Sequence, residues 1–226
     1  MAKRTKQAPR IFLLSPANCG GARAQMIASP AAGFPLARQL RAPEGAPIGE
    51  VFSFVSGLYF RGKLAYARRF ARPPDPDDPV VAGGVLVITP NAGLRSADTP
   101  VTVESFRAFA NVEIDLRNPR YVQPLAASAR ALDEAAGPEC EIVLLGSVAS
   151  GKYVELLLPI FGDRLLFPPD FIGRGDMSRG GLMLRCVHAD LELPYVPLRG
   201  AVRHGARPPR LEPVKPPGKL RSTGKR

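Results

Sequence analysis

Four short apolar runs in this chain each end in a small, polar segment that contains glycine. They are IFLLSPANCGG (11–21), VLVITPNAGL (85–94), EIVLLGSVASGKY (141–153) and RLLFPPDFIGRGDMSRGG (164–181). Apolar runs of this length, bounded by glycine or proline, are typical of buried strands. Because ligands gather at the carboxyl ends of strands in an α/β sheet, we expect a site where these runs break off.

Helical patterns alternate with these runs. The spacing over residues 56–70 predicts an amphipathic helix with Arg61, Lys63, Arg68 and Arg69 on its polar stripe. Another helix begins after Thr102, a candidate N-cap. We also expect helices over 124–136, 153–160 and 177–188, extended segments over 111–116 and 191–198, and a loop with one helical turn over 29–49. The alternation predicts an α/β fold, a single compact domain with a mostly parallel or mixed sheet flanked by helices.

The basic character of the chain lies at its two ends. The formal net charge is +11, of which residues 1–10 carry +4 and residues 203–226 carry +7. Segments rich in Lys, Arg, Pro and Gly bury too little apolar surface to fold, so we expect a domain over 11–202 between two disordered basic arms. Such arms attract the phosphates of nucleic acid, most simply DNA, or they only improve solubility or guide assembly.

Cysteine and histidine are poorly placed for a metal centre. Cys19, Cys140 and Cys186 are scattered and lack paired spacing, so we expect no disulfide framework, no metal and no cofactor. No apolar run approaches the roughly 20 residues that a membrane span needs, and IFLL is too short for a secretory signal. The expectation is a cytoplasmic protein without membrane association, and the oligomeric state stays open.

The segment GSVASGK (146–152) resembles a phosphate-binding P-loop between a strand and a helix. Tyr153, however, stands where a Ser or Thr hydroxyl would hold magnesium, and too few residues follow for an ordinary nucleotide hydrolase. A weaker interpretation keeps one bound phosphate, with backbone N–H groups of this turn around it and Ser147 and Lys152 beside it. The alternative is an ordinary strand-to-helix turn.

Two other strand ends carry candidate ligands. Ser15, Asn18 and Cys19 lie on a glycine-bearing loop, where Cys19 is a nucleophile if a neighbouring base lowers its pKa and an inert thiol otherwise. Asn91 follows the second run. Its amide either binds a base edge or a water, or it satisfies its own turn.

The segment GRGDMSRGG gathers Arg174, Asp176, Ser178 and Arg179 within six residues. Two guanidinium groups beside one carboxylate can bind a phosphate and still present a general base. Alternatively, Asp176 caps the following helix and the arginines lie on its solvated face.

A further basic and aromatic mixture lies in GLYFRGKLAYAR (57–68). Tyr59, Arg61 and Lys63 suit base stacking and phosphate contact, although at helical spacing the rings equally suit the core.

Taken in order, the segments resemble the peroxide-stress protein YaaA family and its uncharacterised relatives. The resemblance rests on LLSPA (13–17), LYFR (58–61) with the basic helix that follows it, the strand and Gly-Leu turn of 85–94, GKY (151–153) before LLP (157–159), and MSR (177–179). It implies a compact α/β domain with a positively lined cleft, DNA association and a relation to base-processing or glycosidic chemistry. Asn18-Cys19 replaces the Lys-Thr of the YaaA proteins, and the middle of the chain is shorter, so the role of that lysine does not carry over.

We therefore expect a DNA-associated, YaaA-like protein that acts at an N-glycosidic bond of a base or nucleotide, with loops 15–20, 89–93, 147–153 and 173–180 lining one cleft. Asp176 and Asn91 are the candidates for positioning the attacking water. The candidates for binding substrate or phosphate are Ser15, Asn18, Cys19, Tyr59, Arg61, Lys63, Ser147, Lys152, Tyr153, Arg174, Ser178 and Arg179. The alternatives are an enzyme acting on a small phosphorylated metabolite or free nucleotide, and a non-catalytic nucleic-acid-binding protein.

Overall fold

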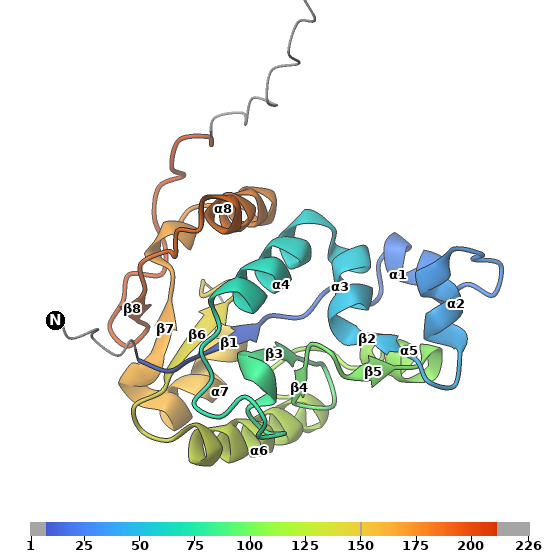
Figure 1. Cartoon of the computed structure of the whole chain (residues 1–226), viewed down its shortest axis with the longest axis horizontal. Coiled ribbons are helices and arrows are strands. Elements are labelled where there is room, and N and C mark those ends of the chain that lie inside the picture. The colour runs from blue at the N-terminus through green and yellow to red at the C-terminus, as the bar shows by residue number, and fades with distance from the viewer. Residues whose placement is uncertain (1–7, 150, 212–226) are drawn as a thin grey trace, which may run out of the picture.

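The structure, a computed structural model, describes residues 8–149 and 151–211. Its centre is a six-stranded sheet with the order β4-β3-β1-β6-β7-β8 (Figure 1). The four inner strands are parallel and the two edge strands are antiparallel to their neighbours, which confirms the predicted α/β domain with a mostly parallel sheet. Along the chain the strands are β1 (Arg10–Leu14), β3 (Val85–Ile88), β4 (Leu94–Ser96), β6 (Glu141–Leu145), β7 (Leu165–Phe167) and β8 (Val196–Pro197).

Strand β1 divides the hydrophobic core in two, because its side chains alternate between the faces of the sheet. Phe12 and Leu14 pack with helices α3 (Ile48–Ser56), α4 (Leu58–Phe70) and α8 (Asp176–Ala189) on one face. Ile11 and Leu13 pack with α6 (Pro119–Ala136) and α7 (Gly151–Phe161) on the other (Figure 1). Burial on both faces explains why this strand is an unbroken apolar run in the sequence.

A smaller group of elements lies beyond the end of β1, on the right of Figure 1. It contains helices α1 (Ala22–Ala28), α2 (Pro35–Arg41) and α5 (Val103–Ala110), and a two-stranded sheet of β2 (Ala46–Pro47) and β5 (Pro100–Val101). Strand β1 leads through residues 15–21 directly into this group. Residues 15–21 therefore connect the central strand to these smaller elements.

Helices α4 and α8 meet at backbone contact. A Cβ atom on Gly62 would lie 2.7 Å from the carbonyl oxygen of Gly180, and a Cβ atom on Gly180 would lie 2.6 Å from that of Leu58. Only glycine permits so close an approach. The contact holds the first turns of the two helices against each other.

Several elements differ from those predicted. Residues 111–116 form turns and not a strand, and residues 29–49 hold α2 and the start of α3 instead of a single helical turn. Helix α6 begins at Pro119, because the Asn118 side chain accepts a hydrogen bond from the Arg120 N–H and proline is tolerated at the first helical position. The predicted N-cap is confirmed, since the Thr102 hydroxyl accepts from the Ser105 N–H.

The described parts of the two basic ends are attached to the fold. Arg10 begins β1, where Glu141 and Glu192 pair with it and the Tyr195 ring lies 4.5 Å away. In the C-terminal segment, the Pro209 carbonyl accepts a hydrogen bond from Arg174 at 3.4 Å. The rest of the predicted arms, residues 1–7 and 212–226, lies outside the described residues. Across residues 8–149 and 151–211, every helix is too short or too polar to cross a membrane.

Candidate functional site

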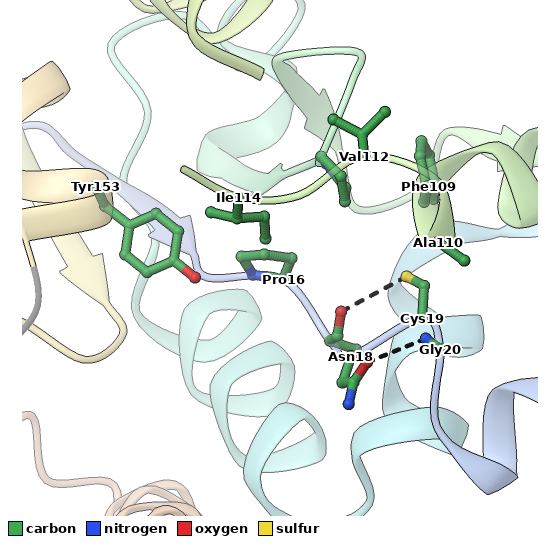
Figure 2. A pocket seen from close by; sticks show the side chains of 11 residues that line it. Pro16, Asn18, Cys19, Gly20, Phe109, Ala110, Val112, Ile114 and Tyr153 are labelled. Carbon is green, nitrogen blue, oxygen red and sulfur yellow. Dashed lines mark hydrogen bonds between the residues drawn. The ribbon is translucent and has the colours of Figure 1, made fainter. Parts of the chain in front are cut away.

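The strand order marks one place in the sheet where a ligand site is favoured. β3 lies on one side of β1 and β6 on the other, so the chain changes direction along the sheet between β3 and β6. Ligands of α/β proteins bind outside the carboxyl ends of strands at such a point. A cavity of about 360 Å³ lies there, which we call the strand-end cavity (Figure 2).

The walls of the strand-end cavity combine polar and apolar groups. Residues 16–20 after β1 and Pro90 after β3 form one side, and Phe109, Val112 and Ile114 contribute further apolar side chains. Tyr153, from the start of α7, points its hydroxyl group toward Pro16 (Figure 2). Burial raises the pKa of Tyr153 to about 12, so this hydroxyl is neutral near pH 7 and can donate a hydrogen bond.

A buried lysine lies directly beside this wall. Lys63, on α4, is 1% exposed, and its Nζ donates to the Ser15 carbonyl oxygen at 2.5 Å and to the Ser15 Oγ at 2.9 Å. The rings of Tyr59 and Phe60 lie 4.5 and 4.6 Å from the same nitrogen. Because Ser15 immediately precedes Pro16, Lys63 anchors the segment that forms the cavity wall.

Burial lowers the pKa of Lys63 from 10.5 to about 7. The carboxylate of Asp176 opposes this change and the guanidinium of Arg179 adds to it, but both effects are smaller than desolvation. Charged and neutral amines are therefore present in comparable amounts near pH 7. In its neutral form the amine can also accept a hydrogen bond from the Ser15 hydroxyl.

The prediction that Lys63 lies on the polar stripe of its helix is wrong. Lys63 shares the buried face with Tyr59, Tyr66 and Phe70, which follow the spacing of a single helical stripe. That spacing was present in the sequence and places the lysine inside. Its charge suggested the opposite face.

Helix α8 brings two more of the predicted residues to the same place. Arg179 is buried, its Nε donates to the Phe171 carbonyl oxygen at 3.1 Å, and its guanidinium lies 3.6 Å from Asp176. The Asp176 side chain is 68% exposed and opens the helix without capping it, because Gly175 is the N-cap. The alternative of a capping aspartate with arginines on the solvated face is therefore wrong for Asp176 and Arg179.

Tyr59 links these groups. Its hydroxyl is buried and completes no hydrogen bond among the described residues, although Ser15 and Arg179 lie close enough to affect its pKa, which burial raises to about 12. Tyr59 and Asp176 also interact electrostatically with Tyr153 on the cavity wall. We refer to Ser15, Tyr59, Lys63, Asp176 and Arg179 as the lysine cluster.

Three other candidates contact backbone groups with their side chains. Asn91 donates to the Ala108 carbonyl oxygen at 3.3 Å, and the Asn18 side chain accepts from the Gly20 N–H at 3.0 Å. The Cys19 thiol is buried and contacts the Ala17 carbonyl oxygen (Figure 2). Burial raises the pKa of Cys19 to about 12, which favours the inert thiol over the nucleophile.

The remaining candidates make other contacts. Lys152 is exposed, and its charge makes a small contribution to lowering the pKa of Asp115, which is lowered mainly by Arg117. Ser147 is half-buried after β6. Arg174 donates to the Asp170 carbonyl oxygen and to Ser178 Oγ, at 2.9 and 3.3 Å. Arg61 is exposed and lines a different cavity.

Within the described ranges, no three His, Cys, Asp or Glu side chains gather closely enough to hold a metal ion. Comparison of the chain with protein-family models, with curated proteins and with solved structures finds no match. The resemblance to the YaaA family therefore stays a prediction, and the function has to be argued from the strand-end cavity and the lysine cluster.

Proposed function

We propose that this protein is a nucleic-acid-associated enzyme that cleaves or transfers at the N-glycosidic bond of a base or nucleotide. One observation carries the proposal: Pro16, on the wall of the strand-end cavity, directly follows Ser15, which accepts hydrogen bonds from Lys63 of the lysine cluster at 2.5 and 2.9 Å. A cavity large enough for a base therefore adjoins the cluster that contains the mostly exposed Asp176 carboxylate. N-glycosidic chemistry requires both, because the base must be held while positive charge develops on the sugar.

The cavity suits a base by size and by lining. Its volume of about 360 Å³ falls within the range of small-ligand sites, and Pro16, Phe109 and Ile114 offer apolar surface for a ring. The neutral hydroxyl of Tyr153 can donate to a ring nitrogen or exocyclic oxygen of that base. A leaving base that receives a hydrogen bond departs more readily, since negative charge builds up on it as the bond breaks.

Asp176 takes the catalytic role in this proposal. Its carboxylate either orients the attacking water or stabilises the cationic sugar, as carboxylates do in glycoside cleavage. Asn91 drops out of the catalytic set, because it does not line the strand-end cavity and its Nδ2 donates to the Ala108 carbonyl oxygen. Lys63 and Arg179 act as positioning residues, the first through Ser15 and the second through its contact with Asp176.

The test is a base-release assay with single-stranded DNA, duplex DNA and free nucleotides as substrates. We expect release from at least one substrate and a loss of about 100-fold in the Asp176→Asn variant, the size typical of a removed general base. Asp77→Asn is the matched control, since Asp77 is exposed and its side chain makes no contact with the site. The proposal fails if no substrate releases a base, or if Asp176→Asn retains the full rate.

Filling the cavity gives a second, independent check. Ile114→Trp places a ring where the base is proposed to bind, so we expect the Michaelis constant to rise at least tenfold while the fold stays intact. Val202→Trp, at an exposed position far from this cavity, is the control for adding an indole. Equal kinetics in the two variants would show that the base binds elsewhere.

A further inference from the structure

A second cavity, of about 980 Å³, lies where α3 ends and α4 begins. We call it the helix-junction cavity. Ser53 and Gly57 line it from this junction, Arg61 from the first turn of α4, Arg23 from α1 and Met177 from α8. It shares no lining residue with the strand-end cavity.

The start of α4 carries positive charge without a compensating acid. Gly57 is the N-cap and provides no side chain, and the first turn contains no Asp or Glu. The N–H groups at a helix start lack partners within the helix and form the positive end of its dipole. Asp or Glu side chains normally occupy the first turn of a helix, whereas the first turn of α4 contains Arg61.

Two arginines add to this charge. A Cβ atom on Gly57 would lie 2.6 Å from Nη1 of Arg23, so that guanidinium packs over the start of the helix. Its one hydrogen bond is long, 3.5 Å to the Phe54 carbonyl oxygen. Arg61 makes no ion pair or hydrogen bond with any described residue. Glu50, the acid among the lining residues, is bound by Arg68 at 3.0 Å.

An independent observation comes from Ser53. This residue lines the same cavity, is 7% exposed, and its hydroxyl has no hydrogen-bond partner in the part of the chain that is described. A buried hydroxyl left without a partner costs about 1–3 kcal/mol. The hydroxyl is covered in this structure, so a rotation of the Ser53 side chain toward the cavity would let a ligand oxygen supply the missing acceptor.

From the uncompensated helix start and the unpartnered hydroxyl, we propose that the helix-junction cavity binds a phosphate group. The phosphate oxygens accept hydrogen bonds from the N–H groups of residues 58–60, from the two guanidinium groups and from Ser53. The lining also includes Met26, Phe54 and Met177, which offer apolar surface to a sugar or base attached to that phosphate. The ligand class is therefore a phosphate monoester or diester of a nucleotide.

The position of the cavity connects it to the proposed reaction centre. Met177, which lines the cavity, follows Asp176 directly in α8, so in the proposed arrangement a nucleotide chain held in the helix-junction cavity extends toward that carboxylate. This connection rests on the proposed function. Phosphate binding itself does not, and a binding measurement without turnover separates the two.

The experiment is calorimetric titration of the full chain with inorganic phosphate, thymidine monophosphate and a twelve-residue oligothymidylate, at constant ionic strength. We expect all three probes to bind the unmodified protein. We expect the double variant Arg23→Gln, Arg61→Gln to bind each probe at least tenfold more weakly. Arg130→Gln, on the exposed side of α6, removes the same charge elsewhere and should change each affinity less than twofold.

The three probes identify the source of the phosphate. If the oligonucleotide binds more than tenfold more tightly than the monophosphate, the site holds a nucleic-acid strand, and if the two affinities are equal, it holds a free nucleotide. The proposal is overturned if inorganic phosphate does not bind, or if the double variant binds as well as the unmodified protein.

Two single substitutions separate binding from folding. Arg61→Glu places an acid in the first turn of α4, so we expect the melting temperature to rise or stay constant while phosphate binding is lost. Ser53→Ala removes a hydroxyl that has no partner, so it should weaken phosphate binding without lowering stability. A stabilised Arg61→Glu variant that still binds phosphate would place the ligand elsewhere.

Discussion

Lys63 makes the stability of this protein depend on pH in an unusual direction. Burial holds its folded pKa near 7, while the unfolded chain restores the ordinary value of 10.5. Between these two values the unfolded state binds more protons than the folded state, so the free energy of unfolding rises with pH. The stability contributed by the neutral amine is complete above pH 10.5 and is lost as the pH falls to about 7.

The size of the effect follows from the two pKa values. A fall from 10.5 to about 7 corresponds to about 5 kcal/mol across the whole window, at about 1.4 kcal/mol for each pH unit. Lys63→Met removes the ionisable group and keeps a side chain of similar length. The pH dependence due to Lys63 disappears in this variant, and Ser15 loses its hydrogen-bond donor.

The assay is urea unfolding of both proteins at pH 7.5, 8.5 and 9.5, followed by circular dichroism. Cysteines and tyrosines titrate in both proteins, so their contributions to the pH dependence cancel when the two unfolding free energies are subtracted. We expect that difference to grow by about 3 kcal/mol in favour of the unmodified protein over these two pH units. Lys152→Met, at an exposed lysine, should show no such change.

A constant difference between the unmodified protein and Lys63→Met would refute this reasoning. The folded amine would then remain protonated throughout, because the Ser15 oxygens and the faces of Tyr59 and Phe60 compensate for its burial. Lys63 would act only as a buried cation that anchors Ser15, with no neutral form near pH 7.

Three further predictions concern packing and reactivity. Gly62→Ala should lower the unfolding free energy by about 3 kcal/mol in thermal melts, because its Cβ would meet the Gly180 backbone. The control Gly181→Ala should raise the unfolding free energy by about 1 kcal/mol, because its Cβ would meet only the Leu211 side chain at 3.8 Å. Equal effects of the two substitutions would contradict the close helix contact. Thr102→Ala should cost about 1 kcal/mol through loss of the α5 N-cap, and Thr102→Ser should restore it. Cys19 should resist iodoacetamide at pH 7.5 until the protein unfolds, as followed by mass spectrometry, because burial raises its pKa to about 12; rapid labelling of the native protein would argue against that environment.

The central strands could be predicted from the sequence because they are buried on both faces. IFLL, VLVI and IVLL are unbroken apolar runs, and each became part of an inner strand. The edge strands β4 and β8 are only two or three residues long and include Arg95 and Pro197. Their conformation depends on pairing with a neighbour, which no local pattern reveals.

The site could be predicted only in part. Residues 16–20, Pro90 and Tyr153 do line one cavity, as expected for strand ends at one edge of a sheet, but residues 173–180 do not line it. The contact of Gly180 with α4 determines where that segment lies, and a glycine in sequence does not show which backbone it will meet. The pairing of Lys63 with Ser15, 48 residues apart, is equally a property of the folded chain.

The backbone contact between α4 and α8 has a consequence for the geometry of the lysine cluster. Lys63 is carried by α4 and Asp176 and Arg179 by α8, whereas Ser15 directly follows the central strand. Because no side chain separates Gly62 from Gly180, backbone packing sets the distance between Lys63 and the two residues of α8. A substitution that widens this helix contact would therefore separate the amine from the carboxylate and the guanidinium, although it replaces none of them.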